Sequence, residues 1–326
     1  MFNKALDTHI QYFLKLNRGF SKGLGYAPHK PILLLSVINL IEKGLISSNR
    51  IFITPELVLT FKEIWKKLVD TPHTENFALP FFHLRSEPFW NLVTYNGLDN
   101  LLTSSKSIKS FKTLKDNIAF AEIDKELFTL ISDSLNSTIF IQALLDNYFP
   151  ATKEYYFLSE HNSTQQQIEI QILNDPKEQY QSHIKELKNK LDTEEFEEEI
   201  FVRGGLFKRM IPKIYNNTCC ISGMKIETSK NIQMIDACHI IPFSSSLDDT
   251  IPNGISLSPN LHRAFDRGLL TINKDYIVRI SPEVKESDSV YSISQFDGFR
   301  ISLPEEPKWY PSIESLTWHN QKIFIL

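Results

Sequence analysis

Apolar positions in the first half of the chain recur mainly with the period of an α-helix. In HKPILLLSVINLIEKG, residues 29–44, they predict a buried helix that Pro31 opens and Gly44 closes. PELVLTFKEIWKKLVD, residues 55–70, predicts a second helix with proline in its first turn, and residues 123–149 return to the same spacing. We therefore expect a mainly helical first domain.

One stretch of this domain departs from the helical period. ALPFFHLRSEPFWNLVT, residues 78–94, contains two prolines, clustered aromatic residues and the polar run HLRSE. Because these features interrupt a helix, the stretch is predicted to be strand or loop.

Polar and charged residues dominate the next part, residues 159–200, which includes QQQ and DTEEFEEE. A solvated linker helix without chemistry of its own is the natural interpretation. The alternative is a short coiled-coil contact between two copies of the chain, for which Ile184, Leu187 and Leu191 offer helical spacing.

The last part, residues 201–326, combines both periods. A short basic helix at 203–217, a strand and turn at 218–226, a second strand at 231–243 and a helix at 258–270 predict a compact ββα unit. The tail is expected to fold back as strand and helix. The predicted class is α+β, with a first domain at 1–158, a linker at 159–200 and a second domain at 201–326.

Composition narrows the class of protein. The 326 residues, 42% of them hydrophobic, are enough for two buried cores, and no apolar run approaches the roughly 20 residues of a membrane span. The N-terminus lacks the apolar core of a signal peptide, so we expect a soluble, cytoplasmic protein without membrane contact. Cys219 and Cys220 are adjacent and no C-x-x-C occurs, so neither disulfides nor structural zinc are expected.

Charge is distributed unevenly along the chain. The net charge is −4, yet residues 1–150 hold 16 Lys and Arg against 14 Asp and Glu, and residues 201–281 hold 10 against 6. Two mildly basic bodies joined and followed by acidic segments are compatible with a nucleic-acid partner.

The densest polar chemistry lies in CHIIPFSSSLDDTIPNGISLSPNLHRAFDRG, residues 238–268. His239 has the side chain of a general base near neutral pH, and the Asn253 amide is placed to bond to backbone near it. His262 and Asp266 are four residues apart on a predicted helix, so they share a face and are candidates to hold one cation.

The motifs H-I-x-P, N-G-x-x-L-x-x-N-L-H and F-D-x-G in this stretch resemble those of the HNH endonuclease family, which has a ββα-metal finger. The resemblance covers roughly residues 203–280. It implies that His239 is the general base, Asn253 the residue that orients it and His262 a metal ligand. It also implies hydrolysis of double-stranded DNA with a divalent ion, Mg²⁺ or Mn²⁺.

One position departs from the family pattern. Many members have an aspartate directly before the base as a second metal ligand, where this chain has Cys238. Asp236 lies two residues earlier on the same strand face as Cys238, so either Asp236 or Asp266 is a candidate to complete the site.

The first domain carries a second resemblance. The K-P at 30–31, the P-F-x-x-L at 80–84 and Trp90 are similar to motifs of the sulfur-binding domain of nucleases that restrict phosphorothioate-modified DNA. The resemblance implies an apolar recess for sulfur beside basic groups that contact phosphate and base edges. The candidate DNA-binding residues are Lys30, His73, Pro80, Phe81, His83 and Arg85. His83 stands where the family often has arginine, so the ligand could differ.

Three functions follow from these motifs. The first is a modification-dependent restriction endonuclease, and the second is an HNH nuclease whose first domain reads another mark, an unmodified sequence or a protein partner. The third is a catalytically silent DNA-binding module, which the intact His239, Asn253 and His262 disfavour. A double-strand break needs two cuts, so we expect a homodimer or transient pairing on DNA.

Overall fold

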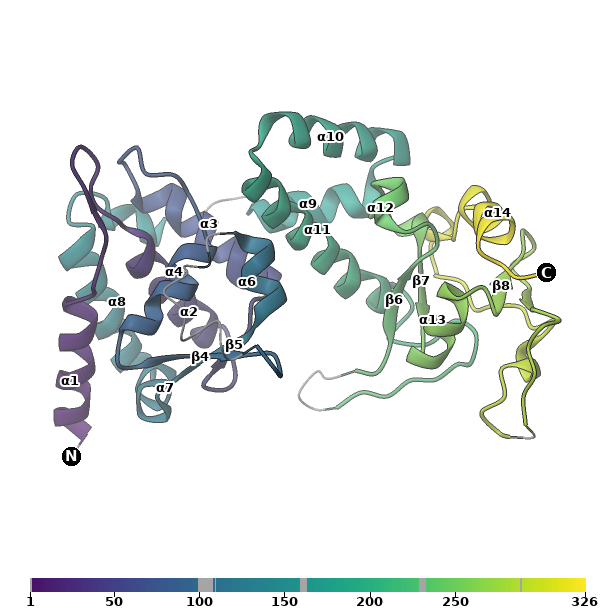
Figure 1. Cartoon of the computed structure of the whole chain (residues 1–326), viewed down its shortest axis with the longest axis horizontal. Coiled ribbons are helices and arrows are strands. Elements are labelled where there is room, and N and C mark those ends of the chain that lie inside the picture. The colour runs from purple at the N-terminus through teal and green to yellow at the C-terminus, as the bar shows by residue number, and fades with distance from the viewer. Residues whose placement is uncertain (1, 99–107, 109, 159–162, 229–232, 288) are drawn as a thin grey trace. The chain divides into compact units, whose positions relative to one another are not determined.

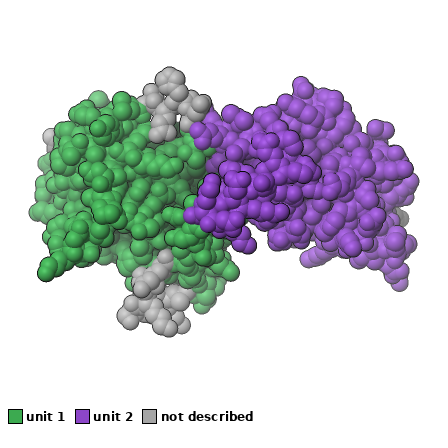
Figure 2. Space-filling model, turned by 90° about the horizontal axis from the view of Figure 1, so that it is seen from above, with its two compact units in different colours: residues 1–164, 191–202 green, residues 165–190, 203–326 purple. Residues whose placement is uncertain are grey.

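The computed structural model describes residues 2–98, 108, 110–158, 163–228, 233–287 and 289–326. They form two compact units, unit 1 with residues 1–164 and 191–202 and unit 2 with residues 165–190 and 203–326 (Figure 2). The expected domain boundary at residue 158 adjoins residues 159–162, which lie outside the described residues. Each unit combines helices with small antiparallel sheets, so the predicted α+β class is confirmed.

Unit 1 is mainly helical (Figure 1). Its helices are α1 Phe2–Leu14, α2 His29–Glu42, α3 Pro55–Leu68, α4 Ala78–His83, α6 Phe111–Asn117, α7 Lys125–Ser132 and α8 Ser134–Tyr148, with short 3-10 turns at Leu84–Ser86 and Lys153–Phe157. Its strands are β1 Phe20–Ser21, β2 Gly25–Tyr26, β3 Arg50–Ile51, β4 Trp90–Thr94 and β5 Ile118–Ile123. The strands β1 and β2 pair as a hairpin, and β3, β5 and β4 form an antiparallel sheet in that order.

The two helices predicted first are confirmed. The helix α2 begins two residues before Pro31 and ends before Gly44, which takes a φ of 70° that favours glycine. It is apolar almost all round and packs against α3, α4 and α8. In α3 the Thr54 side chain accepts a hydrogen bond from the Leu57 amide, and proline follows the cap directly.

The prediction of strand or loop for residues 78–94 is wrong in its first part. Residues 78–83 form the short helix α4, and only Trp90–Thr94 is a strand. A six-residue helix is too short to display a period. Pro80 lies in its first turn, where a backbone N–H needs no partner within the helix, so proline is tolerated there.

Unit 2 contains the remaining elements (Figure 1). Its helices are α9 Thr164–Asn174, α10 Lys177–Lys190, the second half of α11 Thr193–Ile214, α12 Phe243–Ser246, α13 Pro259–Asp266 and α14 Ile313–Lys322, with 3-10 turns at Ile251–Asn253, Ser294–Phe296 and Pro307–Trp309. Its strands are β6 Asp236–His239, β7 Gly254–Leu257, β8 Leu270–Ile272 and β9 Val278–Ile280.

The ββα unit exists, but its strands differ from the predicted pair. The strand β6 pairs antiparallel with β7, which follows the loop after His239, and α13 comes directly after β7. Residues 218–226, predicted as a strand and turn, contain the turn, at residues 220–222, but no strand, and Gly223 takes a φ of 71°. The apolar residues there suggested a strand, but Cys219 and Cys220 are buried at the start of this turn and not in a sheet.

The predicted short basic helix is the second half of the 22-residue α11. The helix starts earlier because glutamate is a good helix former, and Glu194 and Glu195 in its first turn suit the positive end of the helix dipole. Ile184, offered for a dimer contact, is fully buried within the chain. Among the described residues no single helix is long and apolar enough to cross a membrane, and α7 with α8 qualifies only as a pair bent by 101°.

Candidate active site

A cavity of about 350 Å³ in unit 2 gathers the polar residues of the ββα unit. His239 from the end of β6, and His262 and Asp266 from α13, line it together with Lys208 from α11. Because β7 leads into α13 without a long loop, the hairpin and the helix hold these side chains on one short frame. Three residues singled out by their spacing are therefore brought to one cavity.

His239 is held on two sides. Its ring stacks on Phe207 with 3.9 Å between centroids and an interplanar angle of 9°, and its Nε2 lies 2.8 Å from Oδ1 of Asp249. Gly254 lies opposite His239 in the hairpin, and a Cβ there would come within 2.8 Å of the Phe207 ring. Glycine at this position therefore leaves room for the stack.

Asn253 is 1% exposed and acts on the backbone. Its Oδ1 accepts from the Ile241 amide at 2.9 Å, and its Nδ2 donates to the carbonyls of Ile241 and Asp248. These bonds fix both ends of the loop that follows His239. The amide does not bond to the imidazole itself.

His262 lies between two carboxylates. Its Nδ1 is 3.2 Å from Oδ2 of Asp236, and its Nε2 is 3.4 Å from Oδ2 of Asp266. Cys238, fully buried, donates from Sγ to Oδ1 of Asp266 at 3.8 Å. Asp236 and Cys238 thus both face α13, as their two-residue separation on a strand requires.

The residues around His262 fit a divalent cation. One ligand atom each from Cys238, His262 and Asp266 lies within 4.8 Å of the others. Thiolate, imidazole and carboxylate are all metal donors, and a set containing sulfur suits Zn²⁺ better than Mg²⁺, which prefers oxygen. Asp236 bonds to the other ring nitrogen, an arrangement that orients a ligating histidine. Burial, and then the neighbouring Asp266, raise the pKa of the Cys238 thiol well above its usual range.

Sequence reasoning missed Asp249, Phe207 and Lys208. Asp249 lies within residues 238–268, and its place beside a second aspartate was the one signal in the sequence that could have marked it as a site residue. Phe207 and Lys208 lie in the basic helix more than 30 residues before His239, and nothing in their spacing links them to it.

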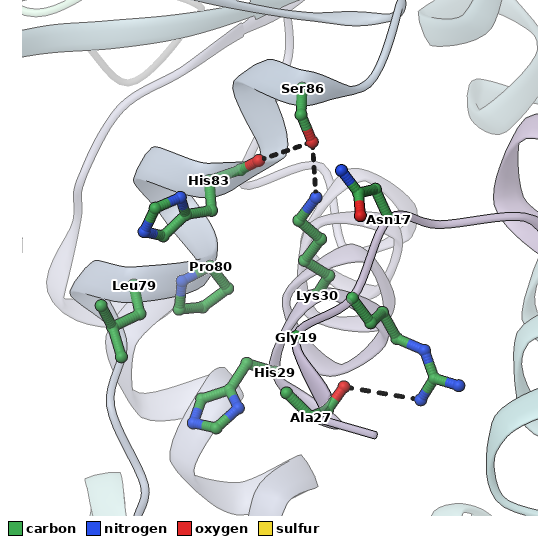
Figure 3. Close-up of a pocket in the computed structure, with 10 residues that line it drawn as sticks. Asn17, Gly19, Ala27, His29, Lys30, Leu79, Pro80, His83 and Ser86 are labelled. Atoms are coloured by element: carbon green, nitrogen blue, oxygen red, sulfur yellow. Dashed lines mark hydrogen bonds between the residues drawn. The ribbon is translucent and has the colours of Figure 1, made fainter. Parts of the chain in front are cut away.

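Unit 1 has a second cavity, of about 410 Å³, shown in Figure 3. Three predicted DNA-binding residues line it: Lys30 at the start of α2, and Pro80 and His83 from α4. Residues that the sequence did not single out complete the lining: Asn17, Arg18, Gly19, Ala27, His29, Leu79 and Ser86. His29 directly precedes Lys30 in the sequence. Its place beside a predicted DNA-binding residue was therefore the signal that could have identified it.

The positive charge of Lys30 in this cavity is compensated by the neighbouring carboxylate of Glu87. Nζ of Lys30 donates to Ser86 and, at 2.5 Å, to Oε1 of Glu87, and both ionic groups are buried. Burial lowers the pKa of His29 to about 4, and burial, Lys30 and Arg85 lower that of His83. At neutral pH the cavity therefore combines neutral imidazoles with the guanidinium of Arg18, beside apolar side chains.

The other predicted residues of unit 1 lie outside this cavity. Phe81 is fully buried, with its ring edge-on to Trp90 at 5.4 Å, so its place is in the core. The guanidinium of Arg85 lies over the Phe82 ring at 4.0 Å. His73 bonds to Thr71.

The hairpin of β6 and β7, the helix α13 directly after it, and two histidines with an aspartate at one cavity form the ββα arrangement that the family resemblance predicts. Residues 219–273 match a family model described as HNH endonuclease, so the predicted resemblance of this part of the chain to that family is confirmed.

Among solved structures, a modification-dependent TagI restriction endonuclease is similar, with 19% identity and a TM-score of 0.27. The match covers 36% of this chain and 37% of that one. Curated proteins gave no match. The resemblance of the first domain to a sulfur-binding domain stays a prediction.

Proposed function

We propose that the chain is a metal-dependent endonuclease that cleaves double-stranded DNA carrying a modification, with phosphorothioate as the leading candidate. The observation that carries the nuclease is the convergence of His239, His262 and Asp266 on one cavity of an HNH domain. A base and a cation site at one cavity are what phosphodiester hydrolysis requires.

In this proposal His239 accepts the proton of the attacking water, and Asn253 keeps the following loop in place. Cys238, His262 and Asp266 would hold the divalent ion, which when bound supplies positive charge for the phosphate and the leaving oxygen. Asp236 orients His262 through its Nδ1. Lys208, on the rim of the cavity, is suited to contact a DNA phosphate.

Recognition is assigned to the cavity of unit 1. Leu79, Pro80 and Ala27 give it an apolar wall, while Arg18 supplies a cation. Sulfur in a phosphorothioate is larger and less strongly hydrated than oxygen. An apolar wall beside the cations Arg18 and Lys30, of which Lys30 is already paired with Glu87, therefore favours sulfur over oxygen. His29 and His83, neutral at physiological pH, offer ring nitrogens for neighbouring polar groups.

The test is cleavage of matched phosphorothioate-containing and ordinary duplexes with Mg²⁺, Mn²⁺ or Zn²⁺, with His239→Ala as the inactive control. Cutting of the modified duplex alone is expected. Cutting of both duplexes would keep the nuclease and assign another specificity to unit 1. If neither is cut while the chain binds DNA in a salt-dependent manner, the silent binding module is the better description.

A further inference from the structure

The imidazole of His239 bonds to a buried carboxylate. Oδ1 of Asp249 lies 2.8 Å from Nε2, and Asp249 is 1% exposed. Asn253, the residue that the family motif assigns to orientation, bonds instead to the backbone around Ile241 and Asp248. Ring orientation and loop position are thus controlled by different side chains.

Asp249 is in turn held by a residue of α10. The hydroxyl of Tyr180 donates to Oδ2 of Asp249 at 3.4 Å, and the Tyr180 side chain is fully buried. Burial raises the pKa of the phenol, so it stays a hydrogen donor. Arg203 from α11 lies over the Tyr180 ring at 5.7 Å. The segment interpreted as a linker therefore contributes a side chain behind the catalytic histidine.

The physical consequence concerns the position of one proton. A carboxylate accepts only, so the bond to Asp249 requires hydrogen on Nε2 of His239 and leaves Nδ1 with a free lone pair. The aspartate of a Ser-His-Asp triad holds its imidazole in one tautomer and one orientation in the same way. Resting on the nuclease activity proposed above, we propose that Asp249 is the positioning residue of the general base and that Tyr180 positions Asp249.

The first test reads the proton directly and needs no substrate. The full chain is labelled with ¹⁵N-histidine, the His239 signals are assigned from their loss in His239→Ala, and the tautomer is read at about pH 8.5, where an ordinary imidazole is neutral. We expect hydrogen on Nε2, and a mixed or reversed tautomer in Asp249→Asn and Asp249→Ala. Hydrogen on Nδ1 in the unaltered chain, or an unchanged tautomer in both variants, would overturn the inference.

Matched controls separate this role from loss of a buried polar group. Asp248→Asn changes the neighbouring buried aspartate, whose Oδ1 accepts from the Thr250 amide. Tyr215→Phe removes another buried hydroxyl of unit 2, one that has no partner among the described residues. Both controls should leave the tautomer unchanged, whereas Tyr180→Phe should broaden or shift the His239 signals.

Kinetics then test the consequence on a duplex that the unaltered chain cuts. Asp249→Asn should lower kcat by about 10²–10⁴-fold with little change in KM, and Tyr180→Phe should lower it less. If His239→Ala is inactive while both Asp249 variants keep the original kcat, the positioning role fails and the nuclease stands. If the unaltered chain cuts nothing, the proposed function fails, and the tautomer still decides the role of Asp249.

Discussion

The cavities of the two units differ in the chemical groups that line them, and therefore in the kind of ligand that each can bind. In unit 2, Asp266, Cys238 and His262 present electron pairs to one point, as a cation site does. In unit 1, a guanidinium and neutral histidines stand beside apolar side chains, and the one lysine is already paired with Glu87. The first arrangement fits the phosphodiester hydrolysis that we propose, and the second fits the proposed recognition of a modified phosphate. The difference can be tested residue by residue.

The largest effect is expected at the cation site. His262→Ala should lower the cleavage rate by about 10³-fold or more, because it removes one of the metal ligands proposed above, and a bound ion provides several kcal/mol of charge stabilisation. The rate of single-turnover cleavage measures this loss, and anisotropy of a labelled duplex should show unchanged binding. Asp275→Ala, at an exposed aspartate of the same unit, is the control. Full activity of His262→Ala with every metal ion tested would show that cleavage does not depend on a cation held by His262.

The next effect separates stability from recognition in unit 1. Lys30→Met leaves the buried Glu87 carboxylate without the cation of its ion pair, which should cost about 3–5 kcal/mol of unfolding free energy. The double variant Lys30→Met with Glu87→Gln removes both charges and should recover most of that stability. Urea unfolding measures both.

Duplex binding by the same double variant decides the role of the pair. Binding that stays weak when stability has returned would mean that Lys30 contacts the ligand. Binding that returns with stability would mean that the ion pair only supports the cavity.

These two sites also show what a sequence can disclose. Asp236, His262 and Asp266 could be predicted because a hairpin and one helix, encoded within about thirty residues, fix their distances by local geometry alone. The cavity of unit 1 joins residues 17–30 with residues 79–86, and only the packing of α2 against α4 brings these segments together. Tyr180 and Phe207 were missed for the same reason, since their helices reach the site through tertiary packing.

A third, smaller effect tests the packing that holds the His239 ring against Phe207. A Cβ on Gly254 would lie 2.3 Å from Cδ1 of Ile211, so Gly254→Ala must displace side chains of α11. We expect a loss of about 1–3 kcal/mol in unfolding free energy and slower cleavage, because overpacking disturbs the Phe207 stack. Gly204→Ala in the same helix meets no atom within 4 Å and should stabilise by about 0.5–1 kcal/mol. Equal effects of the two variants in urea unfolding would contradict this account.

The smallest effect concerns Glu75, a half-buried carboxylic acid of unit 1. Burial raises the pKa of Glu75 to about 7, although Lys62 lies 3.7 Å away. The folded state therefore binds a proton that the unfolded chain has released, so unfolding free energy falls as pH rises from about 5 to 8. Glu75→Gln cannot ionise and should show a fall smaller by about 1–2 kcal/mol, allowing for partial exposure. Urea unfolding at both pH values measures it, with Glu305→Gln as an exposed control. An equal fall in Glu75→Gln and the unaltered chain would mean that Glu75 is ionised throughout, held by Lys62 as an ordinary ion pair.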